Sequence, residues 1–255
     1  MITGVFSGKG GVGKTTATIN LGLAMKRLGH EAVIVDGDLR NPNLAIHLGQ
    51  LSYHKTLQDI LEKDSSVAEA VYAHETGLRF VPSHISLRYF RTDPAQLREA
   101  LSALEQHILI DSPPGLSSES MNILDCCDDI VVVTQPLVPD IADCMKTIEV
   151  ARDMGKAVRG IILNKVRGRD YELKKEEIAA VTNTPIISEV PWDENFLRAL
   201  KLKVPLVGHC PHCPASRAFF AAASHLSGIE YVPPKIPPFE RFMAMVKNAM
   251  RAKRR

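Results

Sequence analysis

The sequence of 255 residues lacks several features that define whole classes of protein. No apolar run approaches the roughly 18 residues that a membrane-spanning helix needs, so we do not expect an integral membrane protein. Its five cysteines are an odd number in a chain of this length, which is not typical of a disulfide framework. Residues 1–6 form a strand-like run without the basic flank and cleavage segment of a signal peptide. We therefore expect a cytoplasmic protein in a reducing compartment.

The overall composition is ordinary, but the charge is unevenly distributed. Apolar residues make up 45% of the chain and charged residues 24%, as in soluble globular proteins. The formal net charge is only +2. Residues 239–255 hold six basic residues and one acidic residue, a net charge of +5, which leaves −3 for residues 1–238. A mildly acidic body thus precedes a strongly basic tail.

Short runs rich in Val, Ile and Leu alternate with helical stretches over residues 1–230. Such continuous apolar strands are typical of a parallel sheet that helices cover on both faces. The sequence therefore predicts an α/β fold with a doubly wound, mainly parallel, Rossmann-like sheet. The expected strands are 2–7, 31–36, 78–81, 107–111, 130–134, 160–164 and 186–190, and the expected helices include 15–28, 140–154 and one that begins at Asp93-Pro94.

Four prolines within residues 232–238 interrupt this alternation. A proline-rich segment of this kind is typical of a stiff, extended spacer. We therefore expect one domain over residues 1–230, a spacer over 231–238 and a separate tail helix over 239–255.

The tail has the pattern of a basic amphipathic helix. Its apolar residues recur at helical spacing and form one stripe, made of Phe239, Phe242, Met243, Val246 and Met250. A basic amphipathic helix after a spacer is typical of a peripheral membrane anchor. The same segment could instead dock on its own domain, bind a partner protein or neutralise DNA phosphates.

The strongest chemical signal is the segment Gly8-Lys9-Gly10-Gly11-Val12-Gly13-Lys14-Thr15, which lies between the first expected strand and the first expected helix. It fits G-x-x-x-x-G-K-[ST], the pattern of a phosphate-binding loop. Glycines allow successive backbone N–H groups to converge on phosphate oxygens, and the helix N-terminus that follows adds its positive dipole. We expect Lys14 to reach the β- and γ-phosphates and the Thr15 hydroxyl to bind Mg²⁺.

Three acidic residues follow expected strands. Asp36 and Asp38 come at the end of the second strand, and Asp111 ends the strand 107–111. The carboxyl ends of strands in an open parallel sheet border the ligand crevice. These three carboxylates are therefore expected to face the nucleotide, where a metal ion offsets their mutual repulsion.

The loop and these acids resemble the MinD/ParA family of deviant Walker A P-loop ATPases. The resemblance rests on Lys9 within the segment from Lys9 to Thr16, on residues 38–44, on residues 111–115 and on Asn164-Lys165. It covers essentially residues 1–230, and the pattern looks most similar to MinD, especially its archaeal forms.

The resemblance implies a Mg²⁺-dependent ATPase that hydrolyses the β–γ bond of ATP and forms a homodimer in the ATP state. Lys9 would contact the phosphates of the partner chain, and Asp38 would orient the attacking water. Asp36 and Asp111 would support Mg²⁺, and Asn43 would sense the γ-phosphate or the partner. The tail would bind the membrane reversibly and so position a division apparatus or another large assembly, together with an unknown activating protein.

The same resemblance implies how the base is held. Asn164 and Lys165 would lie on the adenine side, where the amide of Asn164 can pair with the edge of the base. Pro191 and Asp193 belong to a segment that the family folds over the base. Two other functions stay open: a ParA-like ATPase that partitions DNA, and an ATPase that carries a metal ion or an iron–sulfur cluster.

The carrier alternative depends on Cys210 and Cys213, a C-x-x-C pair flanked by His209 and His212. A closed zinc site needs four ligands, which one chain could complete only with histidine and two chains could supply as four cysteines. Related ATPases hold iron–sulfur clusters with such a pair. Zinc or cluster binding, a redox-labile pair and a structural loop are therefore all compatible with the sequence. The other cysteines, Cys126, Cys127 and Cys144, are expected in the core.

Overall fold

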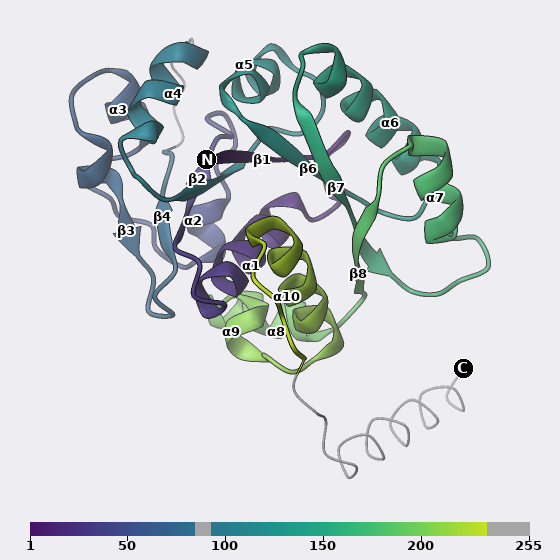
Figure 1. Cartoon of the computed structure of the whole chain (residues 1–255). Helices are drawn as coiled ribbons and strands as arrows, with labels where there is room; N and C mark the ends of the chain where they lie inside the picture. The colour runs from purple at the N-terminus through teal and green to yellow at the C-terminus, as the bar shows by residue number, and fades with distance from the viewer. Residues whose placement is uncertain (85–92, 234–255) are drawn as a thin grey trace.

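Eight strands form one sheet in the computed structural model of the chain, which describes residues 1–84 and 93–233 (Figure 1). The strand order is β3-β4-β2-β5-β1-β6-β7-β8. Every neighbouring pair is parallel except β3 and β4, which are antiparallel. The strands are β1 (Ile2–Phe6), β2 (Ala32–Asp36), β3 (Tyr72–Ala73), β4 (Arg79–Val81), β5 (His107–Asp111), β6 (Asp129–Thr134), β7 (Ala157–Val166) and β8 (Ile186–Pro191).

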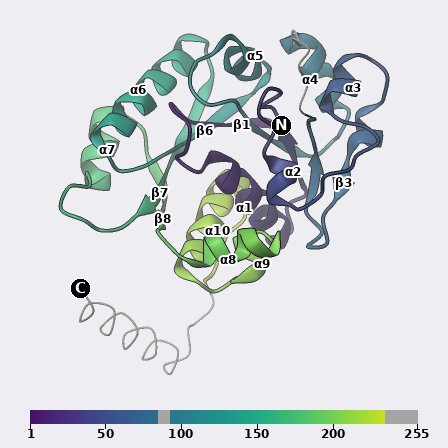
Figure 2. The same ribbon diagram turned by 180° about the vertical axis from the view of Figure 1, so that it is seen from behind.

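Helices cover both faces of this sheet, as the sequence predicts. The helices on one side are α1 (Lys14–Arg27), α2 (Leu44–His47), α8 (Asn195–Leu202), α9 (Leu206–His209) and α10 (Pro214–Ser227). The other side holds α3 (Leu57–Leu61), the 3-10 helix η1 (Val67–Ala70), α4 (Pro94–Ser102), α5 (Ser118–Cys126), α6 (Val138–Asp153) and α7 (Lys175–Thr182). Views from the front and from behind agree that α5, α6 and α7 lie across the sheet from α1, α8, α9 and α10 (Figures 1 and 2).

Side-chain alternation along the strands builds the two cores. On β5, Leu109 packs on the α1 side, whereas Ile108 and Ile110 pack on the α5 side. Successive strand residues point to opposite faces, and here both faces are covered, so every residue of this strand is buried. This explains why the strands read as continuous apolar runs.

The predicted fold class is confirmed, and the differences from the predicted elements are mostly small. The expected strands and helices all occur, with ends shifted by a residue or two except in β7. That strand runs from Ala157 to Val166 rather than over 160–164, because β6 pairs with its beginning and β8 with its end. The short antiparallel strand β3, at the edge of the sheet, has no counterpart among the predicted elements.

The sheet topology gathers the conspicuous polar residues at one edge. β1 lies between β5 and β6, and its carboxyl end leads into the glycine-rich loop and α1. β2 ends at Asp36 and β5 at Asp111, and these two residues are paired across the strands. The carboxyl edge around β1 is therefore where a ligand crevice is expected in an open parallel sheet.

The last described residues run back along α10. The Tyr231 ring stacks on Phe220 with ring centroids 5.0 Å apart, and the Tyr231 amide donates to the Ser224 hydroxyl at 3.2 Å. The expected tail helix and its apolar stripe, and all but the beginning of the spacer, lie outside the described residues. Within the described part of the chain, none of the helices has the length and apolar character needed to cross a membrane.

Candidate functional site

The glycine-rich loop adopts a conformation that its sequence makes possible. Gly11 and Gly13 have φ values of 81° and 95°, in the region that glycine adopts without steric cost. A Cβ atom on Gly13 would lie 2.3 Å from the amide nitrogen of Asn164, so a side chain there would collide with β7. The loop can therefore approach both a ligand and Asn164 closely only with glycine at this position.

The Asp111 carboxylate accepts hydrogen bonds from the glycine-rich loop and from α1. Its Oδ1 accepts from the Lys14 ammonium at 2.5 Å, and its Oδ2 accepts from the Thr15 hydroxyl at 2.6 Å. The Thr18 hydroxyl, one turn further along α1, donates to Oδ1 at 3.2 Å. Lys14 and Asp111 are both buried, so this is a charge pair shielded from water. The structure thus brings the loop lysine and the Thr15 hydroxyl onto one carboxylate.

Two further carboxylates lie beside Asp111. Asp36 is fully buried, and burial together with the Asp111 charge raises the pKa of its carboxyl well above the usual range. It accepts backbone hydrogen bonds from Leu44 at 3.0 Å and from Asp38 at 3.3 Å. Burial also raises the pKa of Asp38, whose Oδ1 accepts from the backbone N–H of Asn41 at 2.9 Å. Asp36 therefore joins β2 to the segment that contains Asp38 and leads to α2.

Lys9 contacts a different carboxylate from Lys14. Its ammonium forms an ion pair with Oδ1 of Asp140, in the first turn of α6, and its side chain is 43% exposed. Asp140 itself is buried, so this ion pair joins a half-exposed lysine to a carboxylate shielded from water. The two lysines of this loop therefore lie in different surroundings. Lys14 contacts the buried carboxyl ends of the strands, whereas Lys9 lies at the rim of the site.

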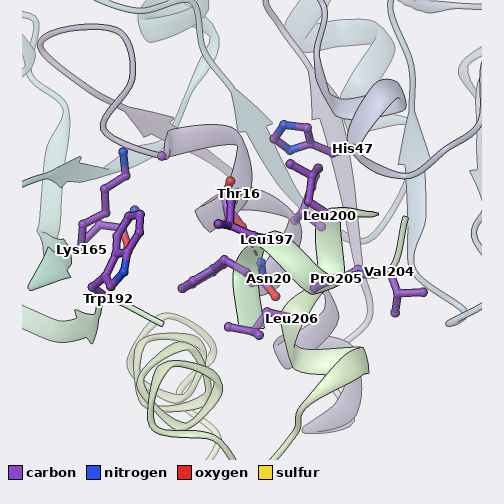
Figure 3. A pocket seen from close by; sticks show the side chains of 15 residues that line it. Thr16, Asn20, His47, Lys165, Trp192, Leu197, Leu200, Val204, Pro205 and Leu206 are labelled. Carbon is purple, nitrogen blue, oxygen red and sulfur yellow. Dashed lines mark hydrogen bonds between the residues drawn. The ribbon is translucent and has the colours of Figure 1, made fainter. Parts of the chain in front are cut away.

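A groove extends from the glycine-rich loop along α1 and is mostly apolar (Figure 3). Gly13, Thr16 and Asn164 line the end nearest the loop, and Leu197 and Leu200 of α8 line the opposite wall. The side-chain amide nitrogen of Asn164 donates to the Val12 carbonyl at 2.8 Å, whereas its Oδ1 is buried and has no hydrogen-bond partner within residues 1–84 and 93–233. A buried acceptor without a donor is costly. The groove therefore offers an apolar wall and one free acceptor for a flat polar ligand.

Lys165 and Trp192 border the same end of the groove. The Lys165 ammonium donates to the Gly11 carbonyl at 2.5 Å, and burial lowers the pKa of this lysine. The Arg167 guanidinium lies over the Trp192 ring, 4.5 Å from its centroid. Figure 3 shows Lys165 and Trp192 side by side, across the groove from Leu200 and His47.

The remaining predicted contacts lie further out. Pro191 ends β8 and Asp193 accepts from the Asn195 amide at 2.9 Å, but the groove lining includes only Trp192 from this segment. Asn43 is exposed at the beginning of α2, and its side-chain amide donates to the backbone carbonyl of Asn41 at 2.6 Å. Neither Asn43 nor Asp193 belongs to the lining of the groove.

Residues 4–206 match the family model described as the CobQ/CobB/MinD/ParA nucleotide binding domain. The chain belongs to the MinD/ParA family. An ATP-binding protein of Methanocaldococcus jannaschii is 32% identical over 231 residues, which are 89% of this chain and 88% of that protein. The predicted family and its nucleotide-binding character are therefore confirmed.

Two solved MinD structures share the fold. The cell division ATPase MinD of Pyrococcus furiosus has a TM-score of 0.83 and 29% identity, over 90% of this chain and 99% of that one. The septum site-determining protein MinD of Pyrococcus horikoshii, complexed with Mg-ADP, has a TM-score of 0.83 and 30% identity, over 92% and 99% of the two chains. The similarity to archaeal MinD is thus confirmed, and it supports a nucleotide and Mg²⁺ at this site.

The residues present fit both groups. The Thr15 hydroxyl at the start of α1 donates to Asp111, and Asp36 is paired with Asp111 across the strand ends, so all three bring oxygen, the ligand type that Mg²⁺ prefers, to this edge. Asn164 Oδ1 is an unpartnered buried acceptor beside the phosphate loop, as a base with an amino group would require.

The cysteine pair gains no such support as a metal centre. Cys210 and Cys213 lie at the turn between α9 and α10, and over residues 1–84 and 93–233 no group of three or more His, Cys, Asp or Glu side chains is placed to hold a metal ion. Cys126, Cys127 and Cys144 are buried, as the sequence predicts.

Two contacts in this region could not be found by motif alone, those of Thr18 and Asp140. Trp192, in contrast, lies within the segment 191–193 that the resemblance places at the base. The only signal for Thr18 is its spacing of four residues from Lys14, which places both on one face of α1. Asp140 meets Lys9 only because α6 follows β6, the neighbour of β1 in the sheet.

Proposed function

We propose that this chain is an ATP-driven positioning switch: it binds ATP with Mg²⁺, forms a homodimer in the ATP state, hydrolyses the β–γ bond and binds the membrane reversibly. Its task would be to place a division apparatus or another large assembly. The observation that carries the dimer is the separation of the two loop lysines. Lys14 is buried on Asp111, whereas Lys9 lies half-exposed at the rim, where a second copy can reach it.

Separate residues would bind the phosphates, hold Mg²⁺ and orient the attacking water. Lys14 binds the β- and γ-phosphates, and Thr15, Asp111 and Asp36 would hold Mg²⁺, which when bound neutralises charge on the phosphate oxygens. Asp38 orients the attacking water. Lys9 of the partner chain would stabilise the charge that develops on the transferred group, as an arginine finger does. Such a lysine makes hydrolysis conditional on dimerisation.

The groove supplies base recognition in this proposal. Asn164 Oδ1 accepts from the exocyclic amino group of adenine, while its amide nitrogen stays bonded to the Val12 carbonyl. Guanine presents a carbonyl oxygen at the same ring position and would leave two acceptors facing each other. The apolar walls at Leu197 and Leu200 exclude water from the rest of the base.

Membrane binding rests on residues 239–255 and their net charge of +5. Each basic residue near an anionic surface contributes roughly 1 kcal/mol, and the stripe of Phe239, Phe242, Met243, Val246 and Met250 adds apolar burial. One tail binds weakly, whereas two tails on a dimer bind by avidity. ATP-controlled dimerisation would therefore control a peripheral, reversible membrane association of a cytoplasmic protein.

Liposome sedimentation tests this switch directly. The full chain and a form that ends at Pro238 are mixed with vesicles of phosphatidylglycerol or of phosphatidylcholine, with ATP or ADP. We expect pelleting by the full chain with ATP and phosphatidylglycerol, and little in the other combinations. The variant Phe242→Ser keeps all basic charges and should pellet less. Equal pelleting of the truncated form would contradict a tail anchor.

A ParA-like function is the main competing outcome. It predicts salt-sensitive binding of the full chain to non-specific DNA in the presence of ATP, because phosphate contacts release counterions. DNA binding without vesicle binding in matched salt would favour that function over a membrane switch.

A further inference from the structure

The pair Cys210 and Cys213 has no part in the proposed ATPase chemistry, yet the fold holds it in a defined turn. The Cys210 amide donates to the Leu206 carbonyl at 2.7 Å, which closes the last turn of α9. The Cys213 amide donates to the Cys210 carbonyl at 3.2 Å. Such a four-residue turn holds its first and last Cα atoms within roughly 7 Å of each other. This is about the longest Cα separation that a disulfide spans.

The two thiols differ in their surroundings. Cys213 is the N-cap of the 14-residue helix α10, it packs in the core with 8% of its surface exposed, and its thiol donates to the Ser216 hydroxyl at 3.3 Å. Burial raises the pKa of Cys213 to about 12, and the neighbouring Cys210 thiol adds to this rise while Ser216 opposes it. Cys210 is only half-buried. One thiol is thus accessible to a reagent, and its neighbour is protected.

The remaining cysteines provide an internal contrast. Cys126 and Cys127 are buried, and each thiol donates to the Ile123 carbonyl at 3.1 Å. Cys144 is fully buried in α6. None of these three combines exposure with a second thiol across a turn, so reactivity toward a soluble reagent is expected only at Cys210 and Cys213.

We propose that Cys210 and Cys213 are a dithiol that oxidises reversibly to an intrachain disulfide, with a low-molecular-weight disulfide as the oxidant. The Cys210 thiolate attacks one sulfur of the reagent, so that a mixed disulfide forms and one thiol leaves. The Cys213 thiol then loses its proton and attacks the Cys210 sulfur, which releases the second thiol. The protein dithiol loses two electrons and two protons, and the reagent gains them as two thiols.

The position of the pair connects it to the groove. Leu206, at the other end of the four-residue helix α9, lines the groove, and the Val207 amide donates to Asn20 Oδ1 of α1 at 2.9 Å. Closing the disulfide removes the bond from Cys213 to Ser216 and fixes the last turn of α9 against α10. The exchange itself needs no nucleotide, so the inference does not depend on the proposed ATPase function.

Peptide mapping separates this pair from the other cysteines. The reduced full chain is incubated with oxidised glutathione, quenched with acid, unfolded, alkylated and digested with trypsin. Cleavage after Lys203 and Arg217 places both Cys210 and Cys213 in one peptide, whereas cleavage after Arg98 and Lys146 places the other three cysteines in another. We expect the peptide 204–217 to be lighter by two hydrogen atoms and free of alkyl groups, and the peptide 99–146 to carry three alkyl groups.

Two variants test the assigned roles. Cys213→Ser should trap glutathione on Cys210, because no second thiol is present to displace it. Cys210→Ser should react at least about 10-fold more slowly, because the remaining thiol is buried and protonated. Three results would overturn the proposal: alkylation of both Cys210 and Cys213 after oxidation, a stable glutathione adduct on the unaltered chain, or copurified zinc in equal amount to the chain that blocks oxidation.

Discussion

The strands of the central sheet carry polar residues at both of their ends, but these residues differ in how they are paired. The amino ends of the strands form the amino edge of the sheet, and their carboxyl ends form the carboxyl edge. At the amino edge, the Thr3 hydroxyl donates to Asp129 at 2.6 Å and pairs with His107 at 2.8 Å, and His107 pairs with His30 at 2.9 Å. Each of these groups has a partner within the chain. At the carboxyl edge, by contrast, Asn164 Oδ1 is buried and has no hydrogen-bond partner among the described residues.

This difference separates stability from function within one fold. Buried polar groups that are paired can stabilise the fold, whereas buried groups left without a partner cost free energy. Such a cost at the carboxyl edge is expected where a ligand or a second chain completes the pairing. Changes at the carboxyl edge should therefore alter nucleotide chemistry, and changes at the amino edge should alter stability only.

The largest expected effect is that of Lys9→Ala on dimer-dependent ATP turnover. A cation supplied in trans is worth about 10³-fold or more in rate, because it meets charge that develops only in the transition state. We expect turnover to fall about 10³-fold while ATP affinity changes only a few-fold. Lys146→Ala, a change in an exposed lysine of α6, is the control and should leave turnover unchanged. Normal turnover in Lys9→Ala would show that the exposed lysine has no trans role.

The next largest effect is expected for Asp38→Ala, which should slow ATP hydrolysis while ATP still binds. Loss of a group that positions or deprotonates water costs about 10²-fold or more in rate. Steady-state hydrolysis should fall by that amount, and equilibrium binding of ATP should persist because Lys14 and Asp111 are intact. Asp153→Ala removes an exposed acid at the end of α6, outside the groove lining, and should hydrolyse ATP normally. Unchanged hydrolysis in Asp38→Ala would remove the water-positioning role.

Much of the carboxyl edge could be predicted from the sequence because its signals are local. The glycine pattern fixes Lys14 and Thr15, and strand ends fix Asp36 and Asp111, so parallel topology alone brings them together. Thr18 and Asp140 could not be predicted, because their partners lie 93 and 131 residues away and depend on strand order. The amino-edge network was not predictable either, since no motif joins Thr3, His107 and Asp129.

Asn164→Ala should change base selectivity by a smaller factor. The unpartnered Oδ1 gains a donor only from a base with an amino group, which is worth roughly 1 kcal/mol or somewhat more. We expect ATP affinity to fall about 10-fold and the preference for ATP over GTP to shrink, as measured by calorimetric titration of both nucleotides. Asn20→Ala changes another asparagine of the groove, whose Oδ1 already pairs with Val207, and should keep the preference. An unaltered preference in Asn164→Ala would mean that the free acceptor does not read the base.

The amino edge should affect nucleotide chemistry least, and its histidine should contribute to the pH dependence of stability. Burial, with a contribution from His30, lowers the pKa of His107 from 6.5 to about 4. Between these pH values the unfolded chain binds a proton that the folded chain excludes, so the free energy of unfolding falls as pH drops through this window. Urea unfolding at pH 7 and pH 5 should show a smaller loss for His107→Gln than for the unaltered chain, with ATP affinity at pH 7 unchanged in both. Equal losses would mean that His107 titrates alike in the folded and unfolded chains. A reduced ATP affinity in His107→Gln would instead show that the two edges are coupled through β5. The amino edge would then affect nucleotide binding as well as stability.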